Sequence, residues 1–321
     1  MLKTSFSPPF WQFEGHLQTI YPSFFRKISL SYEKERLELE DGDFLDLEWL
    51  NNDSDKLILV THGLEGDASR HYVTGMIQKF HEQGFDGLGW NCRSCSGEMN
   101  RLPKFYHHGD AEDLRAVMEY AIKKKGYKEV VLAGFSMGGS LTLRLVAEKP
   151  ELLPVEVKLA AVASVPLDLR DSVEELQKPI KRFYMDRFLR KLEVKIKQKS
   201  VQFPDNDFFK GEAKTNNFFE FDGKYTAPLH GYKDAFDFYA KASAKPLLNR
   251  IKVPTLIVQA LNDPFLGDKC FDLGKAESNS NLKLLLPKEG GHVGFMQSGQ
   301  KSTYVEDQAL SFYHDLKKAS E

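Results

Sequence analysis

Residues 134–138 read Gly-Phe-Ser-Met-Gly, and this Gly-x-Ser-x-Gly pattern places a candidate nucleophile, Ser136, at its centre. A short apolar run over 130–133 precedes the pattern and helix-forming residues over 141–148 follow it, so we expect a strand, a sharp turn and a helix. Such a turn strains the backbone of the serine, exposes its hydroxyl and needs small residues on either side. The sequence therefore predicts nucleophilic catalysis by Ser136, with a plain glycine-rich turn as the alternative.

A serine hydroxyl is a weak nucleophile near neutral pH and needs an adjacent base. His292 stands among glycines in the loop 290–294, directly after the last apolar run, and we expect it to accept the serine proton. The acid should follow the preceding apolar run, where Asp263 is the first candidate and Asp268 the second. A carboxylate there would fix the imidazole tautomer and stabilise the imidazolium of the transition state.

The oxyanion that forms during such a reaction needs two backbone amides. One should be the amide of Met137, just after the nucleophile. We expect the other from the loop His62-Gly63-Leu64, which follows the first apolar strand, and choose the Leu64 amide. Loss of one such donor typically costs about 3 kcal/mol of transition-state stabilisation. This loop contains neither of the two glycine-rich phosphate-binding patterns, so we do not expect a nucleotide site there.

The elements that must position these residues alternate along the chain. Continuous apolar runs predict buried strands over 56–61, 130–133, 158–164, 253–260 and 282–286, and we expect another strand over 86–91. Helical patterns cover 69–83, 110–125 and 304–319, and alternating apolar and charged residues over 36–40 and 44–50 predict an antiparallel hairpin. This order predicts an α/β fold, a mostly parallel sheet with helices on both faces.

Two segments stand outside this alternation. Residues 1–35 are rich in aromatics and prolines and predict an irregular arm packed on the body, with His16 anchoring it by hydrogen bonds. Residues from about 168 to 232 are charged and aromatic without strand runs, and we expect a helical cap inserted between core strands. With no internal repeat or low-complexity linker, the whole chain, 1–321, is predicted to form one domain.

The predicted cap contains a strongly basic helix. Residues 178–200 carry nine Lys or Arg and two acids, and apolar residues recur at every fourth position from Ile180 to Ile196. Six phenylalanines follow between 203 and 221. One interpretation is a cap whose apolar side covers the body. The other is a lid with an aromatic acyl pocket, whose basic face makes transient contact with anionic head groups or an anionic membrane surface.

Composition narrows the classes of function. The formal net charge of −2 gives no reason to expect nucleic acid as a partner. Neither a signal peptide nor an apolar run of membrane-spanning length is visible, and three cysteines suit a reducing compartment, so we expect a cytoplasmic protein. Cys92 and Cys95 match a C-x-x-C pattern with His107 and His108 downstream, but packed thiols are the stronger interpretation than a metal or redox site.

Motifs spread over nearly the whole chain resemble the embryogenesis-associated subfamily of α/β hydrolases, which includes predicted bacterial carboxylesterases and lipid-cleaving eukaryotic relatives. The matching segments are residues 15–19 (GHLQT), 41–44 (DGDF), 62–66 (HGLEG), 91–97, 134–139, 226–232 (TAPLHGY), 262–265 (NDPF) and 291–295 (GHVGF). The resemblance implies an α/β-hydrolase fold with its triad at Ser136, Asp263 and His292. Ser94 stands where the family usually has glycine, and the N-terminal membrane anchor of eukaryotic relatives is absent, which favours a soluble enzyme.

The sequence as a whole predicts a serine hydrolase that cleaves small-molecule or lipid-like carboxylic esters through an acyl-enzyme. This chemistry needs no metal ion and no organic cofactor. Three alternatives remain: an acyltransferase that uses the same triad, an amidase or peptidase, and a non-catalytic binding protein built on a hydrolase fold. A serine at position 136 argues against the aspartate nucleophile of related dehalogenases and epoxide hydrolases.

Overall fold

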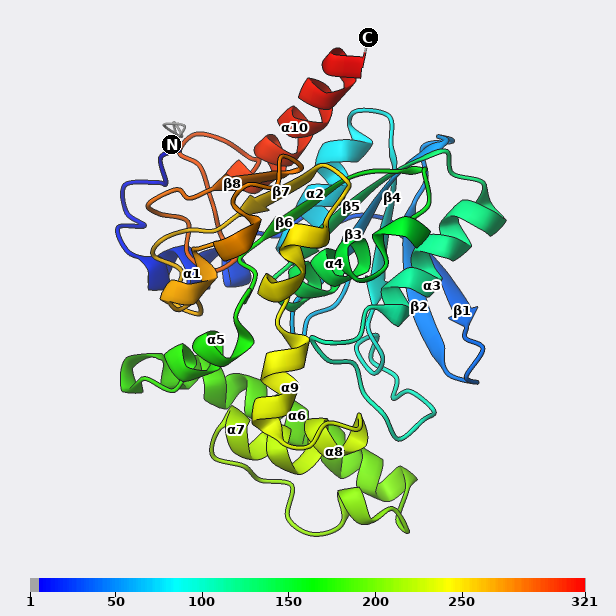
Figure 1. The fold of residues 1–321 in the computed structure, drawn as a ribbon, viewed down its shortest axis with the longest axis vertical. Coiled ribbons are helices and arrows are strands. Elements are labelled where there is room, and N and C mark those ends of the chain that lie inside the picture. The colour runs from blue at the N-terminus through cyan, green and yellow to red at the C-terminus, as the bar shows by residue number, and fades with distance from the viewer. Residues whose placement is uncertain (1–5, 321) are drawn as a thin grey trace.

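The computed structural model describes residues 6–320, and eight of its strands form one sheet. The strands are β1 (Glu33–Glu38), β2 (Phe44–Leu50), β3 (Lys56–Thr61), β4 (Asp86–Asn91), β5 (Glu129–Phe135), β6 (Val157–Ala163), β7 (Thr255–Val258) and β8 (Leu282–Leu285). Their order in the sheet is β1-β2-β4-β3-β5-β6-β7-β8 (Figure 1). Both pairings of β2 are antiparallel and all the others are parallel, so the predicted sheet and hairpin are confirmed.

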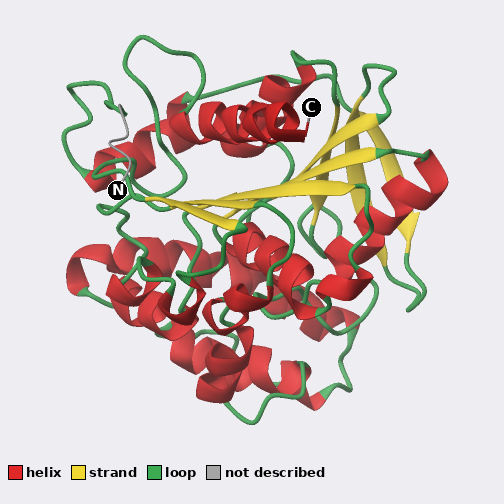
Figure 2. Ribbon diagram, turned by 45° about the horizontal axis from the view of Figure 1, so that its top comes forward, coloured by secondary structure: helices red, strands yellow, loops and turns green. Residues whose placement is uncertain are grey.

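Each face of the central strands is covered, which explains their continuous apolar sequence. In β5, Val130 and Leu132 pack into one core cluster, while Val131 and Ala133 pack into the other. Helices α3 (Glu112–Tyr120) and α4 (Met137–Glu148) contribute to the first cluster. Helices α2 (His71–His81) and α10 (Tyr304–Ser320) contribute to the second. Figure 2 shows the sheet nearly edge-on between these helical layers.

The N-terminal arm is more regular than the sequence prediction. Helix α1 (Gly15–Phe25) lies within it, so the expectation of an irregular arm was wrong over these residues. The Glu14 side chain caps this helix by accepting a hydrogen bond from the Leu17 amide at 3.0 Å, which satisfies one of the free amides of the first turn. His16 anchors the arm as expected, because its Nδ1 lies 3.1 Å from the Tyr184 hydroxyl and the two rings stack.

Between β6 and β7 the structure has helices and no strand, and the role of this segment as a cap stays a prediction. We call α5 to α9 the helical layer: α5 (Leu169–Leu176), α6 (Arg182–Gln202), α7 (Phe218–Phe221), α8 (Ala227–Leu229) and α9 (Ala235–Ala242). Figure 1 shows these helices together below the sheet. They share a core cluster of their own, separate from the two on the faces of the sheet. None of the helices within residues 6–320 combines the length and apolar composition needed to cross a bilayer.

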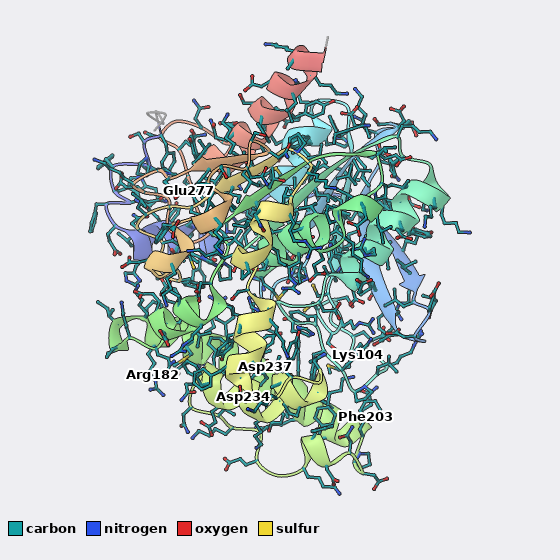
Figure 3. All side chains as sticks on the ribbon, in the orientation of Figure 1. Lys104, Arg182, Phe203, Asp234, Asp237 and Glu277 are labelled. Atoms are coloured by element: carbon teal, nitrogen blue, oxygen red, sulfur yellow. The ribbon has the colours of Figure 1, made fainter. Side chains whose placement is uncertain are left out.

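Helix α6 is the predicted basic helix, and it crosses the helical layer from Arg182 to the neighbourhood of Phe203 (Figure 3). Its buried side includes Tyr184 and Ile196, as the apolar spacing predicts. Ile180 does not belong to that side, since its side chain is 71% exposed. A short 3-10 turn, Pro179–Lys181, precedes α6 and breaks the helical register at this residue.

Candidate active site

Ser136 stands between β5 and α4 with φ 55° and ψ −122°, a backbone conformation that side chains rarely adopt. The close approach that the motif predicts is visible at both glycines. A Cβ on Gly138 would lie 2.3 Å from the carbonyl oxygen of Thr61, and one on Gly134 would lie 2.4 Å from the carbonyl oxygen of Gly138. The strained turn therefore holds the serine against the end of β3, where the loop 62–66 begins.

The three residues chosen from the sequence form one hydrogen-bonded chain. His292 Nε2 lies 3.0 Å from Ser136 Oγ, and His292 Nδ1 lies 3.0 and 2.9 Å from the two carboxylate oxygens of Asp263. In the tautomer whose Nδ1–H donates to Asp263, Nε2 is free to accept the serine proton. Asp268, the second candidate, is exposed and begins a short turn. Among the described residues it makes no hydrogen bond to His292.

The imidazole of His292 is held from several sides. Phe265 stacks on it at a centroid distance of 3.9 Å, and the Phe265 amide donates to Asp263 Oδ1 at 2.9 Å. The amide of Val293 donates to Ser164 Oγ at 2.9 Å. Both Asp263 and His292 are buried. Packing and hydrogen bonds thus fix the base opposite the serine, which favours proton transfer without reorganisation.

We call residues 290–295 the histidine loop, and helix α1 is its main support. Thr19 Oγ1 accepts a hydrogen bond from the His292 amide at 2.8 Å. Gln18 Oε1 accepts from the Gly290 amide at 2.7 Å and from Asn262 Nδ2 at 2.9 Å. The contact is so close that a Cβ on Gly294 would lie 1.9 Å from the carbonyl oxygen of Gln18. Sequence analysis missed this role of α1, although the motif at 15–19 was visible as a family feature.

We call residues 62–66 the oxyanion loop, because they include the amide that the sequence assigns to the oxyanion. A Cβ on Gly63 would lie 3.1 Å from Ser136 Cβ, so the loop runs directly beside the serine. Neither the Leu64 amide nor the Met137 amide donates to another group of the described chain outside regular helix bonding. Two backbone amides without a partner next to Ser136 are what a developing oxyanion would require.

His62 supports this loop through two hydrogen bonds of a neutral imidazole. Its Nδ1 lies 2.7 Å from the Gly63 carbonyl oxygen, and its Nε2 accepts a hydrogen bond from the Cys92 amide at 3.0 Å. These two contacts need one protonated and one unprotonated nitrogen. Burial lowers the pKa of His62 to about 4, which keeps the ring in this state near neutral pH.

Glu65 fastens the oxyanion loop to the helical layer, and we call its contacts with Tyr106, Lys191 and Lys195 the Glu65 clamp. The Tyr106 hydroxyl accepts from the Glu65 amide at 2.9 Å and donates to Glu65 Oε1 at 2.6 Å. Lys195 Nζ donates to the same oxygen at 2.7 Å, and Lys191 Nζ donates to the Glu65 carbonyl at 2.9 Å. Glu65 itself has φ 54°, so these contacts stabilise a conformation that a non-glycine residue seldom takes.

A cavity lined mostly by apolar side chains opens from Ser136 into the helical layer, and we call it the apolar cavity. Its walls include Leu64, Leu169, Val173, Phe188, Phe218 and Phe221. Of the six phenylalanines that the sequence suggested for an acyl pocket, Phe218 and Phe221 line it, whereas Phe208 is 43% exposed. The site thus offers an apolar substrate arm a place beside the nucleophile.

The cysteines stand apart from this chemistry. Cys92 and Cys95 are free thiols, and burial raises the pKa of both. Lys195 Nζ contacts Cys95 Sγ at 3.3 Å. Within residues 6–320, no three His, Cys, Asp or Glu side chains gather in a group that could hold a metal ion.

Comparison with known proteins assigns the fold to a family. A family model described as alpha/beta hydrolase fold matches residues 56–298. The chain is 35% identical over 289 residues to YheT of Escherichia coli (strain K12), provisionally described as an esterase, covering 88% of this chain and 84% of that protein. It is 28% identical over 318 residues to human phospholipase ABHD3, covering 94% of this chain and 76% of that protein.

Solved structures agree with this assignment at the level of the fold. The esterase Pf2001 of Pyrococcus furiosus superimposes with a TM-score of 0.57 over 90% of this chain and 92% of that one. Sequence identity over the superposition is 18%. At that identity the likeness concerns the arrangement of strands and helices.

Proposed function

Because this chain belongs to the α/β hydrolase family, we propose that it is a serine esterase with Ser136 as nucleophile, His292 as base and Asp263 as the acid that orients it. The observation that carries the proposal is the hydrogen-bonded chain from Asp263 through His292 to the strained Ser136. Esterases and phospholipases among the relatives support ester hydrolysis as the reaction.

The proposed reaction has two halves. His292 Nε2 takes the hydroxyl proton as Ser136 Oγ attacks the ester carbonyl, and the amides of Leu64 and Met137 stabilise the oxyanion. The imidazolium, held by Asp263, then protonates the leaving alcohol and an acyl-enzyme remains. Water attacks this acyl group with the same base and the same oxyanion donors, which releases the carboxylic acid and restores the serine.

The apolar cavity supports a substrate with an apolar arm, a lipid-like rather than a very small ester. We propose that the acyl chain occupies this cavity beneath helices α5 to α9, which then act as the cap of a single α/β-hydrolase domain. A cytoplasmic location and contact of residues 178–200 with an anionic membrane surface stay predictions.

The proposal is tested by hydrolysis of nitrophenyl esters from acetate to palmitate. We expect Ser136→Ala to lower kcat at least about 10⁴-fold, because the nucleophile and its proton transfer are lost together. Ser140→Ala is the matched control, since its buried hydroxyl, one turn along α4, has no hydrogen-bond partner among residues 6–320. Equal activity of wild type and Ser136→Ala would contradict the proposal. Addition of an alcohol acceptor separates the acyltransferase alternative, which would yield a new ester instead of free acid.

A further inference from the structure

A second cavity meets the apolar cavity at the nucleophile. Both are lined by Leu64, Ser136 and His292, but the second leads between the oxyanion loop and α6 rather than into the helical layer. Four cationic side chains line it, and we call it the basic cleft. They are Arg70, Arg187, Arg190 and Lys191.

Within residues 6–320, three of these four cations, Arg187, Arg190 and Lys191, form no ion pair with a carboxylate. Arg187 makes no ion pair, and its guanidinium lies 5.7 Å from the ring centre of Phe24. Arg190 and Lys191 donate to backbone carbonyl oxygens, those of Asp186 and Glu65.

Acidic groups offset this charge only weakly. Arg70 has one carboxylate, that of Asp67, at 3.4 Å. Glu65 is the one acidic residue among the described residues that line the cleft, and its carboxylate is already bound by Lys195 and Tyr106. The cleft thus carries an excess of positive charge beside the serine.

The pKa of Lys191 is lowered in this cleft. Burial lowers its pKa, and the positive charges of Arg70 and Arg187 lower it further, against the opposite effect of Glu65. Like charges held together in a partly desolvated cleft repel one another, and a bound anion would relieve that repulsion.

We propose that the basic cleft binds a phosphate group carried by the alcohol half of the ester, while the acyl chain lies in the apolar cavity. Guanidinium groups match phosphate oxygens in geometry as well as charge, and a dianion gains from several cations at once. The proposal rests on the esterase function proposed above. In the reaction, water and the acylated phosphoalcohol yield a carboxylate, a proton and the free phosphoalcohol. Only the acyl C–O bond breaks and the phosphate ester remains.

The sequence predicts that the basic helix contacts anionic head groups or an anionic membrane surface, and the cleft makes this prediction more specific. Arg187 and Arg190 are exposed, as Lys197 on the same helix is, but together with Lys191 they line the cleft, and Lys197 does not. A general attraction to an anionic surface would use all of these charges alike. A phosphate subsite would use only those in the cleft.

The test compares decanoylglycerol with decanoylglycerol phosphate, both dispersed below their critical micelle concentrations so that no lipid surface is present. We expect wild type to prefer the phosphate ester in kcat/KM. Arg187→Gln should lower this preference about tenfold through loss of a charge-assisted contact. Lys197→Gln, the matched control, should leave the ratio unchanged, and Arg187→Lys should retain part of it because the charge remains.

Binding to the Ser136→Ala protein, measured by calorimetry, provides a readout that does not depend on turnover. Tighter binding of the phosphate ester than of the neutral ester, weakened by Arg187→Gln, supports the subsite even if the hydrolytic proposal fails. Equal binding and equal hydrolysis of the two esters, both as monomers and on vesicles, overturn the subsite and leave the esterase function standing.

Vesicles distinguish a lipid head group from a soluble phosphate ester. Hydrolysis of the phosphate ester in monomeric form means that the subsite recognises the group itself. A preference that appears only on phosphate-containing vesicles, with Arg187→Gln still weaker than Lys197→Gln, means that the subsite takes a head group at a lipid surface. If both variants reduce activity on vesicles equally, the charges act as a surface attraction and the subsite is rejected.

Discussion

The histidine loop and the oxyanion loop both meet Ser136, but they are held in opposite ways. The histidine loop donates two backbone hydrogen bonds to uncharged side chains of α1, those of Gln18 and Thr19. The backbone of the loop also lies close against the backbone of α1. The oxyanion loop is supported by the ionic contacts of the Glu65 clamp, of which Lys191 and Lys195 come from α6.

Because of this difference, we expect the two loops to respond to different kinds of change in the protein. Helix α1 contributes uncharged groups in a tight packing contact, so we expect the backbone of the histidine loop to depend on packing, while the imidazole is also held by the Asp263 carboxylate. Helix α6 belongs to the helical layer and also contributes Phe188 to the wall of the apolar cavity. The helix that lines the cavity proposed for the acyl chain therefore also holds the loop proposed to supply an oxyanion donor, and a displacement of α6 would change both.

The largest effect is expected on the histidine side, from Gly294→Ala. The added Cβ would lie 1.9 Å from the Gln18 carbonyl oxygen, so the loop and α1 must move apart. A shift of about 1 Å in a catalytic base typically costs on the order of 100-fold in rate, and we expect kcat to fall by that amount. Gly223→Ala is the control, because the nearest neighbour of a Cβ there is 4.0 Å away. An active Gly294→Ala enzyme would mean that the loop tolerates displacement.

A smaller effect is expected on the oxyanion side, from Lys195→Met. The change removes the charge that pairs with a Glu65 carboxylate only 4% exposed, so we expect the loop to relax and kcat to fall about tenfold. A boronic acid that mimics the tetrahedral intermediate should bind about tenfold more weakly.

Lys199→Met is the matched control for this variant. Lys199 is also buried in α6, but its ammonium binds the carbonyl oxygens of Asn100 and Leu102, outside the oxyanion loop. Both variants should lose stability, and only Lys195→Met should lose boronate affinity. Equal losses of boronate affinity would show that the clamp merely secures the helix.

The same comparison explains what could be predicted from the sequence. The elbow at Ser136 and the buried strands follow from local patterns, namely a glycine-flanked serine and continuous apolar runs. The α/β fold expected from them and the α/β-hydrolase fold implied by the family resemblance are both confirmed. The choice of Asp263 and His292 follows from their order after successive strands, and the structure brings both to Ser136. Their catalytic roles stay a prediction.

The supports of the two loops were not predictable in this way. Gln18 contacts Gly290 across 272 positions of sequence, and Lys195 contacts Glu65 across 130. Periodicity places Lys195 on the polar part of a basic helix, where a lysine usually faces solvent. Which lysines turn inward depends on the loop that α6 covers, and that contact exists only in the folded chain.

The last effect, and the sharpest for the comparison, concerns the pH dependence of stability and not the rate of reaction. The oxyanion side contains His62, with a pKa of about 4 in the folded protein against about 6.5 in the unfolded chain, whereas Gln18 and Thr19 do not titrate. Because the unfolded state binds the proton more readily, this contribution to stability is complete above about pH 6.5 and is lost as the pH falls toward 4.

We therefore expect the neutral His62 to account for a loss of about 2 kcal/mol in the free energy of unfolding between pH 7 and pH 5. Urea denaturation of wild type and His62→Asn at both pH values measures this loss. The decrease in the free energy of unfolding from pH 7 to pH 5 should be smaller in the variant than in wild type by that amount. Other buried histidines, such as His71, contribute equally to both proteins and cancel. If the variant shows the same pH dependence as wild type, the pKa of His62 is the same in the folded and unfolded chain. The support of the oxyanion loop would then be no more sensitive to acid than that of the histidine loop.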